Sequence, residues 1–142
     1  MAKSIDSFSG EYRFLSNFWM TPLSIGPLTF ASAEHAYQAA KGLDQTEWLK
    51  IIQCSTPGQA KRAGQKINMR SDWDQVKLEL MREIIEAKFT NTNLRKMLVE
   101  TGDLELIEGN NWGDTYWGFC RGRGQNNLGK LLMNERSKHT GD

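Results

Sequence analysis

The stretch Ser32-Ala33-Glu34-His35-Ala36-Tyr37-Gln38-Ala39-Ala40-Lys41 predicts a helix that begins at a serine cap. The Ser32 hydroxyl can accept a hydrogen bond from the first turn, so we expect the helix to run from Ala33 to about Gly42. Glu34 then lies in the positively polarised first turn.

Four side chains with polar groups share one face of this predicted helix. Offsets of three, four and seven residues bring together Glu34, Tyr37, Gln38 and Lys41. A polar stripe of this length is unusual for a core helix. A simpler interpretation also fits, in which Glu34 only complements the helix dipole and Lys41 is a solvated residue near the C-terminal end.

Short strands are predicted before this helix and further helices after it. The residues around Pro22, Gly26 and Pro27 favour strands and turns, with a small hairpin over 23–30. Cap signals predict four later helices. The first opens with an Asp44–Glu47 capping box and reaches Cys54, and the second begins at Pro57. The third is bracketed by Asn93 and Gly102, and the fourth runs from Asn127 to about Lys138. Residues 105–120 are expected to be strand and loop.

The strongest periodic signal is a long helix that begins at Ser71 or Asp72. Its repeat of three or four residues runs through Trp73, Val76, Leu80, Ile84 and Lys88, with Met81 and Ile85 beside it. We therefore expect this helix to be buried along one face.

The composition fits one globular domain. At 142 residues, with 39% hydrophobic and 25% charged residues, the chain has the ordinary balance of a protein with one packed core. A formal net charge of +1 gives no global attraction to a polyanion, so any phosphate recognition has to be local. No repeat, low-complexity tract or linker interrupts residues 1–142, which are expected to form a single domain.

Cysteine and histidine usage gives no sign of a disulfide framework or a metal site. Cys54 and Cys120 lack metal-ligand spacing, and His35 and His139 add too little for a metal cage. The N-terminal residues lack the apolar stretch of a signal peptide, and no run of about 18 apolar residues occurs. We therefore expect a cytoplasmic protein without a structural metal or a membrane segment. No obligate protein partner is evident from the sequence.

Three further segments combine residue types that carry chemistry. Residues 108–118 alternate aromatic side chains with glycine, amides and Asp114, which suits ligand stacking or, equally, a surface turn with two core tryptophans. Residues 121–127 place two arginines and two glycines before the last helix, which suits a phosphate cradle, although such loops are more often simply solvated. Residues 11–18 join aromatic side chains to Arg13 and Asn17, a combination that stacks a flat base or forms ordinary core.

Taken in order, these segments resemble the NADAR (YbiA-like) family over roughly residues 8–136. In the N-terminal part, the motifs that carry the resemblance are Phe14-Leu15-Ser16-Asn17-Phe18, Glu34-His35-Ala36-Tyr37-Gln38-Ala39-Ala40-Lys41 and Ala60-Lys61-Arg62-Ala63-Gly64. They continue with Lys77 through Met81, Lys88-Phe89, Thr101-Gly102-Asp103, Asp114-Thr115-Tyr116-Trp117-Gly118 and Asn127-Leu128-Gly129-Lys130-Leu131-Leu132-Met133. Several specific motifs in the family's order are hard to produce by chance.

The resemblance implies an α+β fold that is mostly helical, a compact single domain with a small β element. It also implies an N-glycosidase that acts on phosphorylated ribosyl compounds without a cofactor, because water is the acceptor. Two substrate types are associated with the family. One is an early ribosylaminopyrimidine phosphate intermediate of riboflavin synthesis, and the other is ADP-ribose attached to guanine in nucleic acid.

Residue by residue, the resemblance places catalysis on Glu34 and Asp114, with Lys41 as a third catalytic residue. Cleavage of a ribosyl C–N bond builds oxocarbenium character on the sugar and negative charge on the departing base, so a carboxylate and a proton donor are both useful. Lys41 offers a second route, in which its amine forms a Schiff base with the ring-opened sugar. The side chains expected to contact substrate are Arg13, Asn17, Phe18, Tyr37, Arg62, Trp73, Trp112 and Trp117.

Two other classes of function stay open at this point. One is a module that binds ADP-ribose or a nucleotide without chemistry, against which the retained Glu34, Lys41 and Asp114 argue. The other is a nucleic-acid-binding domain that uses aromatic stacking beside Arg121 and Arg123. The net charge of +1 disfavours the second, because phosphate contacts normally dominate nucleic-acid affinity.

Overall fold

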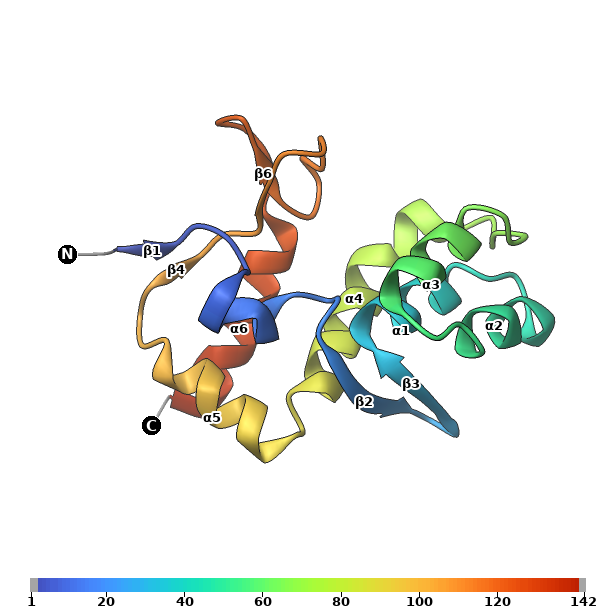
Figure 1. The fold of residues 1–142 in the computed structure, drawn as a ribbon, viewed down its shortest axis with the longest axis horizontal. Coiled ribbons are helices and arrows are strands. Elements are labelled where there is room, and N and C mark those ends of the chain that lie inside the picture. The colour runs from blue at the N-terminus through green and yellow to red at the C-terminus, as the bar shows by residue number, and fades with distance from the viewer. Residues whose placement is uncertain (1–2, 141–142) are drawn as a thin grey trace. The chain divides into compact units, whose positions relative to one another are not determined.

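The computed structural model describes residues 3–140 (Figure 1). Met1 and Ala2, on which the expectation of no signal peptide partly rests, lie outside the described residues, as do Gly141 and Asp142. The helical elements are η1 (Gly10–Leu15), α1 (Ala33–Ala40), α2 (Gln45–Ile52), α3 (Pro57–Gly64), α4 (Trp73–Lys88), α5 (Thr92–Glu100) and α6 (Asn127–Thr140). The strands are β1 (Ser4–Ile5), β2 (Met20–Ile25), β3 (Leu28–Ser32), β4 (Glu105–Leu106), β5 (Gly109–Asn110) and β6 (Phe119–Cys120).

Helices make up about half of the chain and the sheets are small, which confirms the predicted mostly helical α+β class. The contacts divide the chain into two units, each of which is described by itself. Unit 2 is the continuous segment Asn17–Lys88, and unit 1 consists of the residues on either side of it. Among the described residues, no helix is long and apolar enough to cross a membrane.

Unit 2 is built around α1. This helix packs against α2, α3, α4 and the β2–β3 hairpin, and Figure 1 shows the hairpin beside α1 and α4. Three alanines of α1 form its apolar buried face, and the core cluster that they enter consists of Leu23, Phe30, Ala33, Ala36, Ala39, Ile51, Ala60 and Ile84. Because alanine side chains are short, the neighbouring elements can approach the α1 backbone closely on this face. The polar side chains of α1 lie on its other face and make other contacts.

The β2–β3 hairpin confirms the prediction for residues 23–30 and extends it on both sides. The strands are antiparallel, with Leu23 opposite Phe30, and the turn between them contains Gly26 at φ 58°. A left-handed backbone of this kind favours glycine. The chain then passes directly from β3 into α1, so the hairpin fixes where α1 begins.

Most helix starts follow their predicted caps. The Ser32 side chain accepts a hydrogen bond from His35 N, and Thr56 caps α3 with Pro57 as its first residue. The capping box at α2 is only half formed. Asp44 accepts from Glu47 N, but the Glu47 carboxylate binds Asn68 instead of the backbone at Asp44, and the helix ends at Ile52 rather than Cys54.

Unit 1 contains η1, two short parallel strand pairs and two helices. β1 pairs with β4, β5 pairs with β6, and α6 packs against α5 and β4. Asn91, not Asn93, caps α5, because its side chain accepts a hydrogen bond from Leu94 N. Asn126 links the loops by accepting from Glu108 N and donating to Leu106 O, both at 2.9 Å.

Candidate active site

The polar face of α1 forms a hydrogen-bonded row of two buried side chains and one partly buried side chain. Glu34 is 7% exposed and Gln38 is 4% exposed. Gln38 Nε2 donates to Glu34 Oε2 at 2.6 Å, and Lys41 Nζ donates to Gln38 Oε1 at 2.9 Å. The prediction that these side chains share one face is confirmed. Lys41, which the simpler interpretation takes as a solvated residue, is partly buried and bonded to Gln38.

Lys41 has an altered proton affinity in this row. Burial lowers the pKa of the Lys41 amine, and the Glu34 carboxylate partly opposes this by favouring the charged form. The net direction is downward from the ordinary value of 10.5. At neutral pH, Lys41 is therefore closer to the uncharged, nucleophilic state than an exposed lysine is.

An aromatic pair lies in the same unit. Tyr37, on the polar face of α1, meets Trp73, the first residue of α4, with ring centroids 5.3 Å apart and an interplanar angle of 59°. Trp73 is buried, whereas Tyr37 is partly exposed. The tilted pair offers a ring edge and a ring face next to the polar row.

Asn17 adds a buried acceptor close to the start of α1. Its backbone oxygen accepts from Glu34 N at 2.9 Å, and its side-chain Nδ2 donates to Met81 Sδ at 3.5 Å. The side chain is 9% exposed, and Oδ1 has no hydrogen-bond partner within residues 3–140. A buried acceptor without a partner is costly to the fold.

Phe18 and two basic residues of α3, Lys61 and Arg62, are exposed on the surface of unit 2. Phe18 is 44% exposed, and Lys61 Nζ lies 6.0 Å from the centroid of its ring. Arg62 follows Lys61 and is also exposed. This part of the surface therefore presents an aromatic ring and positive charge together, a combination that suits a phosphorylated ligand.

His35, which follows Glu34 in the sequence, has a structural environment. Its Nδ1 lies 2.7 Å from Ser32 Oγ, and its Nε2 lies 3.0 Å from the backbone oxygen of Cys54. Both ring nitrogens are thus used within the fold. His35 ties the start of α1 to the end of α2 and does not join the polar row.

Asp114 organises its own loop in unit 1. Its Oδ1 accepts from the backbone N–H groups of Tyr116 and Trp117 at 3.1 and 2.9 Å. The Asn110 side chain accepts from Asp114 N and donates to Asp114 O. The carboxylate is partly buried and is held in one orientation by this loop.

The remaining predicted contact residues also belong to unit 1. Trp117 packs edge-on against Tyr116 with centroids 4.7 Å apart, and Trp112 is 63% exposed. Arg13 is exposed on η1. The structure therefore brings together Asn17, Glu34, Tyr37, Lys41 and Trp73 within unit 2, whereas Arg13, Trp112, Asp114 and Trp117 lie in the other unit.

The predicted phosphate cradle at 121–127 is wrong in one respect. The backbone N–H groups at the start of α6 already donate to carbonyls of the preceding loop, in the pairs Gln125 to Thr115, Asn126 to Gly118, Asn127 to Tyr116 and Leu128 to Trp117. Arg121 and Gly122 form the tip of a tight turn with φ 52° and 84°. Since those N–H groups are occupied, they are not free to bind a phosphate.

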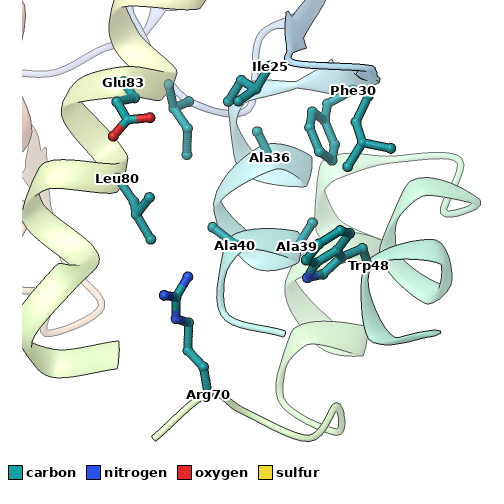
Figure 2. A pocket seen from close by; sticks show the side chains of 11 residues that line it. Ile25, Phe30, Ala36, Ala39, Ala40, Trp48, Arg70, Leu80 and Glu83 are labelled. Carbon is teal, nitrogen blue, oxygen red and sulfur yellow. The ribbon is translucent and has the colours of Figure 1, made fainter. Parts of the chain in front are cut away.

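An apolar pocket of about 150 Å³ is lined by Ala36, Ala39 and Ala40 of α1 (Figure 2). Its lining also includes Phe30 and Trp48, with Arg70 and Glu83 as its charged members. It contains none of the predicted catalytic or contact residues.

The described residues contain neither a disulfide nor a cluster of metal-ligand side chains. Within 3–140, no group of three or more histidine, cysteine or acidic side chains is arranged to hold a metal ion. Cys54 and Cys120 are free thiols.

Comparisons with known proteins agree with this architecture. The NADAR domain model matches residues 6–139. N-glycosidase YbiA of Escherichia coli K12 is 36% identical over 136 residues, covering 93% of this chain and 84% of that protein. A riboflavin biosynthesis protein of Vibrio vulnificus is 36% identical over 132 residues, covering 90% of this chain and 36% of that protein.

The solution structure of E. coli YbiA superimposes with a TM-score of 0.84 at 34% identity, covering 98% of this chain and 86% of that one. The family model, the sequence identity and the fold all agree. The chain belongs to the NADAR domain family.

Proposed function

We propose that this protein is an N-glycosidase that hydrolyses the C–N bond of a phosphorylated ribosyl compound. The observation that carries the proposal is the hydrogen-bonded row of Glu34, Gln38 and Lys41 on one face of α1, in which Glu34 and Gln38 are buried and Lys41 is partly buried. Purely structural helices seldom bury a carboxylate and an amine together, because each loses hydration. The name N-glycosidase carried by the E. coli relative supports the same reaction type.

Glu34 supplies the negative charge that this reaction needs. As the glycosidic bond breaks, its electron pair goes to the base nitrogen, which takes up a proton, and positive charge develops at the sugar C1. A buried carboxylate stabilises that charge more strongly than one in water. Water then adds its oxygen to C1 and releases a proton.

Lys41 provides a second route through the same row. With the sugar ring open, an uncharged Lys41 amine adds to C1 and displaces the base, giving an imine that water hydrolyses to restore the amine. The lowered pKa of Lys41 favours this route, because more of the side chain is uncharged at neutral pH.

The neighbouring residues fit the substrate parts. The tilted Tyr37–Trp73 pair can cover the base or the sugar, and the unpartnered Oδ1 of Asn17 can accept from a ribose hydroxyl. Arg62 is proposed to bind phosphate. Asp114 as a second acid, and Arg13, Trp112 and Trp117 as contacts, are proposed on the sequence resemblance.

For the substrate, we propose the ribosylaminopyrimidine phosphate of riboflavin synthesis. The Vibrio relative carries a riboflavin biosynthesis name, and this chain aligns with about a third of it. Guanine-linked ADP-ribose is the competing substrate. A binding module without chemistry is the competing class of function, and only product formation separates it from an enzyme.

The test is to incubate the purified protein separately with the ribosylaminopyrimidine phosphate and with a guanine-ADP-ribosylated oligonucleotide, and to follow products by mass spectrometry. We expect ribose phosphate from the first. Release of ADP-ribose alone would reassign the substrate. If neither is cut, the enzyme proposal fails and ligand titration tests the binding module.

Variants assign the roles. Glu34→Gln should abolish turnover while keeping the fold, whereas Glu83→Gln, which changes a carboxylate beside the apolar pocket, should retain full activity. An active Glu34→Gln protein would remove Glu34 from the mechanism. Borohydride treatment during turnover should trap a covalent adduct on Lys41 if the imine route operates, and Lys41→Arg should prevent it.

Trp73→Phe tests the aromatic wall. The smaller ring keeps apolar volume but loses contact area, so KM should rise while kcat changes little. An unchanged KM would place Trp73 in the core rather than against the substrate.

A further inference from the structure

Gln38 lies between the two ionisable groups of the row and contacts both. It is four residues after Glu34 and three before Lys41, so all three side chains follow one ridge of α1. The two hydrogen bonds, at 2.6 and 2.9 Å, use the two ends of one amide. The Gln38 side chain is buried, so water does not readily replace either bond.

The chemistry of the partners fixes the direction of the row. An ionised carboxylate only accepts hydrogen bonds, and an ammonium group only donates them. The amide must therefore turn its NH₂ group toward Glu34 and its oxygen toward Lys41, as observed. Both bonds involve a charged partner and are stronger than bonds between neutral groups.

α3 restricts the movement of Gln38. A Cβ atom at Gly64 would overlap Oε1 of Gln38 and would come within 2.7 Å of its Cδ. The Gly64 backbone thus packs directly on the amide. Packing of this kind limits the rotamers of Gln38 and holds its two polar ends in place before any ligand binds.

We propose that Gln38 is a positioning residue for the reaction, whose amide holds the Glu34 carboxylate and the Lys41 amine at fixed positions along one face of α1. This inference rests on the proposed function, because it assigns roles around the same two groups. It predicts that Gln38 acts through Glu34 and Lys41 without touching the substrate. It also explains why the α3 residue that packs on the Gln38 amide is a glycine.

Gln38→Met tests the proposal, since methionine keeps the length of the side chain and removes both hydrogen bonds. The donor from Gln38 favours the ionised form of Glu34, so its loss should raise the pKa of the Glu34 carboxyl. The acid limb of the kcat/KM profile should therefore move to higher pH. We expect kcat to fall about 10- to 100-fold, because small misplacement of reacting groups is costly, and KM to change much less.

Gln38→Glu is the second variant, of nearly the same size. It still offers Lys41 an acceptor but replaces the donor to Glu34 by a like charge, so the acid limb should move further upward than in Gln38→Met. If Gln38→Met fails to fold, the pH profile of Gln38→Glu compared with that of the wild type still tests whether Gln38 positions Glu34. Gln45→Met, at an exposed position of α2, is the matched control and should keep the wild-type profile.

A readout without substrate separates this inference from the proposed function. NMR titration of the Glu34 side-chain carboxyl carbon should show a higher pKa in Gln38→Met than in the wild type, whether or not either substrate is cleaved. Unchanged Glu34 titration together with an unshifted pH profile would overturn the inference. A uniform loss of activity at all pH values, with unchanged titration, would reduce Gln38 to a packing role and would also overturn it.

Discussion

Gly64 and Gln38 are in such close contact that a side chain at position 64 would require Gln38 to move. A Cβ atom there would overlap Oε1 of Gln38 and lie 2.7 Å from its Cδ. The helices α1 and α3 therefore pack backbone against side-chain amide, and the absence of a Cβ sets their separation.

Gly64→Ala should destabilise the protein and disturb the polar row. Overpacking a fixed contact typically costs about 1–3 kcal/mol, which outweighs the better helix propensity of alanine. Gly58→Ala, in the same helix, is the control, because its nearest neighbour would be Arg62 Nη1 at 3.7 Å. Urea unfolding should show Gly58→Ala equal to or more stable than the wild type. A Gly64→Ala protein as stable as Gly58→Ala would show that Gln38 moves aside freely.

Ser32→Ala should cost more than an ordinary cap deletion. The Ser32 hydroxyl accepts from His35 N at 3.1 Å and also lies 2.7 Å from His35 Nδ1, so its loss affects two buried groups. We expect a loss of about 2–3 kcal/mol in the free energy of unfolding. Thr56→Ala removes an exposed cap of α3 and should cost about 1 kcal/mol. Equal losses in the two variants would mean that the histidine contact contributes nothing.

The sequence predicted elements whose signals are local. Ser32, Pro57 and the turn at Gly26 act on their immediate neighbours, and each begins or reverses an element where the pattern indicates. The polar face of α1 was predictable for the same reason, because helical spacing alone brings Glu34 and Lys41 to one side.

Interactions between distant segments were not predictable in this way. Glu47 has the spacing of a capping box, but its carboxylate binds Asn68, twenty-one residues later in the chain. The N–H groups that precede α6 were expected to be free for phosphate, yet carbonyls of residues 115–118 accept from them. The partnerless Oδ1 of Asn17 likewise depends on what packs around it, which no spacing reveals.

Glu47→Gln should weaken the attachment of the Asn68 segment to α2 in a pH-dependent way. The backbone N–H of Asn68 is the main cause that lowers the pKa of the Glu47 carboxyl, with the Lys50 ammonium adding to it. A lowered pKa stabilises the fold above the ordinary glutamate pKa, and this contribution is lost as the pH falls through the folded value. Thermal unfolding should therefore show the largest difference between wild type and Glu47→Gln near neutral pH.

The same comparison has an internal control. Asp74→Asn changes an exposed carboxylate on α4, and its small effect should vary little over the same pH range. If the Glu47→Gln difference is as large at pH 3 as at pH 7, the bond from Asn68 does not depend on the charge of Glu47.

Lys88, at the end of α4, should make the stability of the protein rise with pH above neutrality. The side chain is fully buried, and burial lowers its pKa to about 7 from an ordinary value of 10.5. Between these two values the unfolded chain holds one more proton than the folded one. Stability therefore increases with pH across this window, by at most about 1.4 kcal/mol per pH unit from this group.

Lys88→Met should reduce that slope, because methionine has a similar length and no proton to lose. Urea unfolding of the wild type and the variant at several pH values from 7 to 10 measures it. Lys66→Met, at an exposed position, should keep the wild-type slope. Parallel curves for wild type and Lys88→Met would mean that Lys88 keeps its proton in the folded protein, and that its environment favours the ammonium despite burial.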